Sequence, residues 1–121
     1  MTKKILFIDD SKSVREVLQF TLEENGYDVL IGINGKDGLA FLNGQKIDLI
    51  ITDLHMPEMD GISFIKKARK IKKYQHIPIL FLTTETQLEK KLEAKKSGAT
   101  GWITKPFVAE KLLKTINKVI R

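Results

Sequence analysis

Residues able to carry out phosphate chemistry follow four short apolar segments of this chain. The polar residues directly after these segments are Asp9 and Asp10, Asp53, Thr83 and Thr84, and Lys105. Three carboxylates packed together would repel one another unless a cation joined them. Oxygen ligands without His or Cys suit Mg²⁺ or Mn²⁺, which also accept phosphate oxygens as ligands.

A lysine and a threonine complete this set of groups. The ammonium of Lys105 supplies a positive charge for a phosphoryl oxygen, and the hydroxyl of Thr83 offers a donor to the same anion. In a phosphoryl-transfer site of this kind, the metal and the lysine neutralise charge while one aspartate attacks phosphorus. The chain has neither a P-loop nor the glycine pattern of dinucleotide-binding proteins, so the phosphoryl donor need not be a bound nucleotide.

Short apolar segments alternate along the chain with segments of helical periodicity. We predict strands over residues 4–8, 27–31, 47–52, 79–82 and 101–104. The predicted helices run from a Ser11 N-cap to near Gly26, over 36–42, from 62 onward, over 87–97 and over 108–120.

The helices differ in how many apolar residues they offer to a core. In the first two we expect Val17 and Ala40 to lie on the inward face, together with leucines beside them. The helix over 87–97 has only three apolar side chains of this kind, Leu88, Leu92 and Ala94. We therefore expect it to be the least tightly held of the five.

Alternation of strands and helices, with about 20–25 residues in each unit, is typical of βαβ units and a parallel sheet. Such connections are right-handed and place helices on both faces of the sheet. We predict an α/β protein of the flavodoxin-like (βα)5 class, with a five-stranded sheet in the order 2-1-3-4-5. In that order the carboxyl ends of strands one, three, four and five are neighbours, so the polar residues above converge on one edge.

Composition fits a single soluble domain. The chain has 121 residues, of which 42% are hydrophobic and 30% are charged, and it has no Cys, no long apolar run and no secretory signal. We expect a cytoplasmic protein without membrane insertion. An excess of 21 Lys and Arg over 15 Asp and Glu gives a net charge of +6. DNA binding is a minority hypothesis, because the lysines lie mostly at helical spacing between apolar positions.

Four motifs in order make the chain resemble the receiver domain of two-component response regulators. They are IDDS (8–11), TDLHMPEMDG (52–61), LTTE (82–85) and TKPF (104–107). Within that family, GATGWITKPF (98–107) is most similar to the chemotaxis regulators of the CheY type. The resemblance covers the whole chain and implies a single receiver domain over residues 1–121 without an output domain.

The resemblance also implies roles for individual residues. It makes Asp53 the phosphoacceptor and places Mg²⁺ on Asp10 and Asp53, with Asp9 holding a metal-bound water and His55 contributing its backbone carbonyl. It makes Thr83 the switch hydroxyl, Lys105 the lysine that contacts the phosphoryl group, and Pro106 a cis proline. Trp102 stands where the family commonly has a Tyr or Phe switch residue, and His55 stands where an Asn is often seen.

The function implied is that of a signalling switch rather than an enzyme. A CheA-like histidine kinase would phosphorylate Asp53, a phosphatase is a possible further partner, and a flagellar motor switch protein would bind the lysine-rich surface around 87–97 and 108–120. Two alternatives stay open. One is a phosphorelay intermediate that passes its phosphoryl group to a histidine phosphotransfer protein. The other is a Mg²⁺-dependent phosphohydrolase with Asp53 as nucleophile, although such hydrolases generally need a cap that these short loops do not provide.

Overall fold

The structure, a computed structural model, describes residues 2–120. Its five strands are β1 (Lys4–Ile8), β2 (Asp28–Gly32), β3 (Leu49–Thr52), β4 (Ile79–Thr83) and β5 (Gly101–Thr104). All are parallel and form one sheet in the order β2-β1-β3-β4-β5. The fold class and the strand order predicted from the sequence are therefore confirmed.

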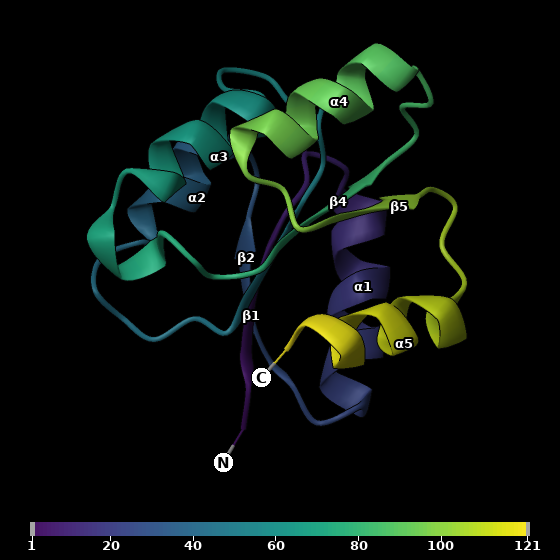
Figure 1. The fold of residues 1–121 in the computed structure, drawn as a ribbon. Coiled ribbons are helices and arrows are strands. Elements are labelled where there is room, and N and C mark those ends of the chain that lie inside the picture. Colours follow the sequence, from purple (N-terminus) through teal and green to yellow (C-terminus); the bar gives the residue numbers. More distant parts are fainter. Residues whose placement is uncertain (1, 121) are drawn as a thin grey trace.

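The helices follow the strands in strict alternation. They are α1 (Lys12–Glu24), α2 (Gly35–Ala40), α3 (Gly61–Arg69), α4 (Leu88–Ser97) and α5 (Ala109–Val119), with a 3₁₀ turn at Lys72–Tyr74. Figure 1 shows α1 and α5 on one face of the sheet and α2, α3 and α4 on the other. As predicted, Ser11 caps α1, accepting a hydrogen bond from the Val14 amide.

Alternate side chains of the central strands supply the two cores. Ile5 and Phe7 of β1 pack in the core beneath α1 and α5, whereas Leu6 and Ile8 pack in the core beneath α2, α3 and α4. A strand buried on both faces needs a continuous apolar run, and β1, β3 and β4 have one. This double burial holds fixed the carboxyl ends of the strands, where the polar residues lie.

Several predicted strand and helix boundaries, and the predicted burial of two helix side chains, differ from the structure. Strand β3 begins at Leu49 rather than at residue 47, because Asp48 is already used to bind the start of β1: its carboxylate and its amide both bond to the Lys4 backbone. Ala40 is exposed, because the short helix α2 turns it to solvent. Val17 is 55% exposed, since α1 packs on the sheet through the buried Leu18 and Leu22 and the half-buried Val14.

Helix α4 is weakly anchored to the rest of the described chain. Of its three apolar side chains only Ala94 is buried, while Leu88 and Leu92 are 68% and 56% exposed. By contrast, α3 buries Ile62, Phe64, Ile65 and Ala68. Burial of apolar area is the main stabilising contribution to a helix in a protein, so α4 is more easily displaced than α3. Within residues 2–120, no helix has the length and apolar character needed to cross a bilayer.

A substitution at Gly61, the first residue of α3, tests how closely this helix must approach the end of β3. A Cβ atom at this position would overlap the Asp53 carbonyl oxygen and come within 3.1 Å of the Leu54 Cα, and both are backbone atoms that cannot turn aside. We expect Gly61→Ala to lower the free energy of unfolding by about 1–3 kcal/mol, the usual cost of overpacking. Urea unfolding followed by circular dichroism measures it.

Ser63→Ala is the matched control, because Ser63 lies in the same turn, is exposed, and contributes only its backbone amide to the Asp60 cap. We expect this change to stay within about 0.5 kcal/mol of the parent. Equal unfolding midpoints for Gly61→Ala and the parent would show that α3 has room to move away from β3.

Candidate functional site

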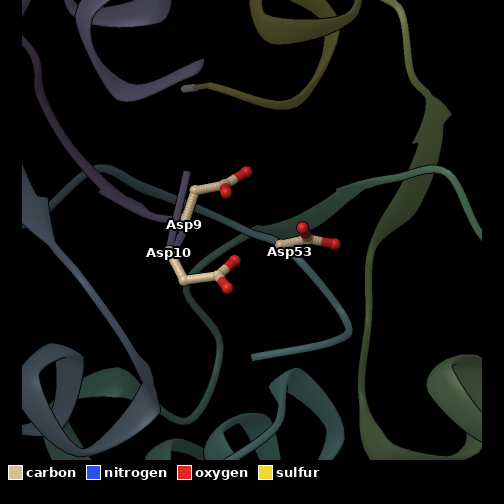
Figure 2. Close-up of side chains that lie close together, drawn as sticks. All are labelled: Asp9, Asp10 and Asp53. Carbon is tan, nitrogen blue, oxygen red and sulfur yellow. The ribbon is translucent and has the colours of Figure 1, made fainter. Parts of the chain in front are cut away.

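Three carboxylates lie together at the carboxyl edge of the sheet. Asp9 and Asp10 directly follow β1 and Asp53 directly follows the neighbouring strand β3, as Figure 2 shows. Carboxylate oxygens of all three lie within 4.8 Å of one another. Asp9 and Asp53 are buried, whereas Asp10 is exposed. The convergence predicted from the strand order is therefore confirmed for these residues.

Lys105 joins two of the three carboxylates. Its Nζ lies 2.6 Å from Asp9 Oδ2 and 2.9 Å from Asp53 Oδ2. The lysine follows β5, and its amide bonds to the Thr83 carbonyl at 2.9 Å, which places it beside the end of β4. The peptide bond from Lys105 to Pro106 is cis, as the resemblance implied.

Opposing effects set the protonation of Lys105. Burial lowers the pKa of its ammonium, but the hydrogen bonds to Asp9 and Asp53 and the charges of both carboxylates outweigh burial, so the pKa is raised above its ordinary 10.5. A raised lysine pKa means that the stabilisation by these bonds is fully present at neutral pH. It is lost only as the pH rises through the pKa of the folded protein.

Asp9 shows the electrostatic cost of this cluster. Burial raises the pKa of its carboxyl above the ordinary 3.8, and this outweighs the hydrogen bonds from Lys105 and from the Ser11 amide. At neutral pH its charged form is therefore less favourable in the folded protein than in the unfolded chain. Three carboxylates against one ammonium leave an excess of two negative charges. An all-oxygen donor set with this excess fits a divalent cation.

Thr83 lies at the end of β4, fully buried. Its hydroxyl accepts a hydrogen bond from the Glu85 amide at 3.2 Å and has no bond to the three carboxylates. The hydroxyl thus fixes the start of the loop that leads to α4. It does not cap that helix, whose N-cap is Gln87.

His55 and Glu85 form a contact that the sequence analysis did not predict. His55 Nε2 lies 2.7 Å from Glu85 Oε1, so the loop after β3 is linked to the loop after β4. Hydrogen bonds from the Gln87 amide and from His55 lower the pKa of the Glu85 carboxyl. The His55 ring is 58% exposed and lies outside the carboxylate cluster. That its backbone carbonyl binds a metal stays a prediction.

A second link, also missed by sequence reasoning, holds the loop after β3 from the other side. Asn34 is buried, and its amide group donates to Glu58 Oε2 at 2.9 Å. The Gly35 amide bonds to the Met59 carbonyl, and a Cβ on Gly35 would lie only 2.8 Å from that oxygen. Asn34 also caps α2, because its side chain accepts a hydrogen bond from the Asp37 amide. The Asn-x-x-Asp pattern at these positions was the sequence signal for this cap.

Trp102 lies on β5, away from the carboxylates. Its ring is half-buried against Phe81, with a centroid distance of 5.7 Å, and the Lys91 Nζ lies 5.7 Å from its centroid. Within the described part of the chain, its indole Nε1 is buried without a hydrogen-bond partner. Leaving such a donor unpaired costs about 1–3 kcal/mol, a cost that a position of the ring giving Nε1 a partner would recover.

Comparisons with known proteins agree with this geometry. Residues 5–117 match the family described as the response regulator receiver domain. Protein PilH of Pseudomonas aeruginosa is 37% identical over 117 residues, which are 97% of each chain. A chemotaxis protein CheY homolog of Campylobacter jejuni is 35% identical over 119 residues, covering 97% of this chain and 92% of the homolog.

A solved structure is similar over nearly the whole chain. The chemotaxis response regulator CheY4 of Vibrio cholerae matches with a TM-score of 0.93 at 45% identity, over 99% of this chain and 100% of that one. Other curated relatives are longer, and this chain spans about half of their length. The family match, the fold and the acidic edge agree, and the chain belongs to the response regulator receiver domain family.

Proposed function

We propose that this chain is a signalling switch that accepts a phosphoryl group on Asp53 from a histidine kinase. One observation carries the choice of residue. Asp9 and Asp53 both bond to Lys105, but the Asp9 side chain is fully buried while that of Asp53 is 11% exposed. Asp10 is open to solvent but has no bond to the lysine. Only Asp53 combines access for a donor with an adjacent positive charge.

The chemistry is a transfer between two nucleophiles. An oxygen of the Asp53 carboxylate forms a bond to phosphorus, the phosphorus–nitrogen bond of the donor's phosphohistidine breaks, and the imidazole leaves with the electron pair and takes a proton. Lys105 offsets the added negative charge. The Thr83 hydroxyl accepts from the Glu85 amide and has its own proton to donate to a phosphoryl oxygen, and a movement of the side chain toward that oxygen would lengthen the contact with the amide.

Mg²⁺ is the proposed cation, held directly by Asp10 and Asp53 and through water by Asp9, with the His55 carbonyl as a further ligand. When bound, it would neutralise carboxylate and phosphoryl charge. The support is the all-oxygen donor set and its excess of negative charge. Mn²⁺ has similar ligand preferences.

A hollow beside Lys105 is the proposed docking place for the kinase. It has a volume of about 600 Å³ and is lined by apolar and small residues of α1 and of the segment after β5, among them Val17 and Phe107. Phe20 and Val108, which are also exposed, lie on the same two segments. Exposed apolar side chains next to a reactive carboxylate suit a partner that must bring its histidine to Asp53.

The proposed output surface is the groove between α4 and β5. It has a volume of about 330 Å³ and is lined by Trp102, Lys91, Leu92 and Lys95 among others. We propose that this receiver domain acts in chemotaxis, through an acidic segment of a flagellar motor switch protein that binds here. The names of the two chemotaxis relatives, the basic groove and the weakly anchored α4 support this assignment.

Asp53→Asn tests the phosphoacceptor. Acetyl phosphate with Mg²⁺ should add one phosphoryl group to the parent and none to this variant, because the amide is not nucleophilic. Intact-mass spectrometry measures the addition. Asp28→Asn is the control, since Asp28 is an exposed acid at the amino end of β2 and should be labelled like the parent. Equal labelling of Asp53→Asn and the parent would contradict the assignment of Asp53 as the phosphoacceptor.

Asp10→Asn tests the metal site. Mg²⁺ should raise the unfolding midpoint of the parent, because a ligand that binds only the folded state stabilises it by mass action. The variant loses one carboxylate ligand, so its midpoint should rise less at the same Mg²⁺ concentration. Thermal unfolding at several MgCl₂ concentrations measures both, with Asp28→Asn expected to respond like the parent. A full response by Asp10→Asn would exclude Asp10 as a ligand.

Beryllofluoride, which mimics the aspartyl phosphate, tests the switch. A synthetic acidic segment of a flagellar switch protein, titrated by Trp102 fluorescence, should bind about 5–150-fold more tightly when beryllofluoride is present, the usual range of coupling between two sites. Raising the salt concentration should weaken binding because the groove is cationic. An affinity independent of beryllofluoride would contradict the switch, and an affinity independent of salt would contradict the electrostatic argument.

A further inference from the structure

The positive charge of this chain is concentrated in one third of its length. Residues 61–100 contain ten Lys and Arg against three Asp and Glu, a net charge of +7. The rest of the chain contains eleven Lys and Arg against twelve Asp and Glu, a net charge of −1. The whole excess of positive charge therefore belongs to the region from α3 to α4.

These cations gather where α3 and α4 end. The two helices lie side by side on one face of the sheet (Figure 1). Arg69 links their ends, since its Nη2 and Nε donate to the Gly98 carbonyl at 2.7 and 3.2 Å. The exposed lysines at these ends and on the 3₁₀ turn are Lys66, Lys67, Lys70, Lys72, Lys73, Lys95 and Lys96.

A groove of about 420 Å³ separates the two helices at this end. We call it the α3–α4 groove, and its lining is Lys66, Arg69, Lys70, Glu93, Lys96 and Ser97. None of its three lysines has an ion pair within the described residues, and Glu93 pairs instead with Lys90 at 3.5 Å. The groove therefore presents unneutralised ammonium groups around one carboxylate.

Folding alone does not account for so many lysines. Each helix C-terminus carries about half a negative charge, and Arg69 already donates to the carbonyl at the end of α4. Two such termini amount to about one negative charge, far less than seven lysines supply. Lys66 and Lys70 are also four residues apart, a spacing at which like charges destabilise a helix. A binding partner is the simpler explanation for this cost.

We propose that the α3–α4 groove binds an acidic, amphipathic segment of another protein, at a surface separate from the α4–β5 groove. The two grooves have no lining residue in common. Binding here requires neither Asp53 nor its phosphorylation. The proposal therefore goes beyond the switch function and stands or falls independently of it.

The lining favours a protein over a nucleic acid or an anionic membrane. Glu93 lies among the lysines, and the adjoining hollow is lined by Glu89, Glu93 and the exposed Leu92 together with Lys95 and Lys96. A continuous row of phosphates would meet repulsion at both glutamates. A peptide can place carboxylates against the lysines, a neutral residue at Glu93 and, just outside the α3–α4 groove, an apolar side chain on Leu92, which also lines the α4–β5 groove.

The experiment uses the full chain labelled with ¹⁵N and a synthetic peptide, Glu-Glu-Leu-Glu-Asp-Leu-Glu-Glu, without beryllofluoride. Amide shifts should change at residues 66–73 and 93–98. One variant removes the lysines of the groove: Lys66→Gln, Lys70→Gln and Lys96→Gln. The control variant makes the same change of net charge at exposed lysines elsewhere: Lys12→Gln, Lys36→Gln and Lys46→Gln. Circular dichroism checks that both variants are folded.

The groove variant should bind the peptide about tenfold more weakly than the parent, and the control variant should bind nearly as well as the parent. Asp53→Asn should bind like the parent, which separates this proposal from the phosphorylation switch. Equal weakening in both triple variants would overturn the proposal, because net charge alone would then explain binding. Tighter, groove-dependent binding of a DNA duplex or of phosphatidylserine vesicles would overturn the choice of a protein partner.

Discussion

The ammonium of Lys105, held between Asp9 and Asp53, is the interaction on which the site depends. Lys105 lies 96 residues after Asp9 and 52 residues after Asp53 in the sequence. The two contacts therefore require β1, β3 and β5 to end at the same level of the sheet. A parallel sheet buried on both faces holds these strand ends in place, although β1 and β5 are not neighbours in it. Even then the three carboxylates of this edge keep an excess of two negative charges over the one ammonium, and burial raises the pKa of the Asp9 carboxyl.

The loops around this edge are held to different degrees. The segment after β3 is fixed on one side by Asn34 through Glu58, and its other side meets the loop after β4 through His55 and Glu85. The first side is held by two hydrogen bonds, one from the buried Asn34 side chain to Glu58 and one from the Gly35 amide to the Met59 carbonyl, whereas the second side has the single contact of the 58% exposed His55. A phosphoryl group that arrived at Asp53 would therefore disturb the loop toward α4 more easily than the loop toward α2.

That direction leads to a weakly anchored part of the fold. Helix α4 buries a single apolar side chain, and the Trp102 ring beneath it leaves its indole N–H unpaired. Both features lower the free energy needed to move α4 and the ring together. The proposed switch needs two arrangements of similar energy, and the weakly anchored α4 is the element that we propose moves between them. Helix α3, which lies beside α4, is firmly buried and would stay in place during such a movement of α4.

The sequence by itself determined the fold and the acidic edge. Continuous apolar runs at β1, β3 and β4 identify buried strands, and their alternation with helical periodicity implies a parallel sheet whose strand ends meet. Asp9, Asp10, Asp53 and Lys105 could thus be brought together from chain order alone. The family motifs added the roles of single residues, of which the cis bond before Pro106 is present in the structure.

Tertiary structure alone decided the contacts between loops and between helix surfaces. His55 and Glu85, or Asn34 and Glu58, are 30 and 24 residues apart on irregular segments, where no periodic pattern links one residue to another. Similarly, the exposure of Val17 and Leu92 depends on which neighbours cover a helix, and not on the apolar pattern of the helix itself. Periodicity records which face of an element is apolar, whereas the pairing of side chains across elements depends on distances that only the packed chain defines.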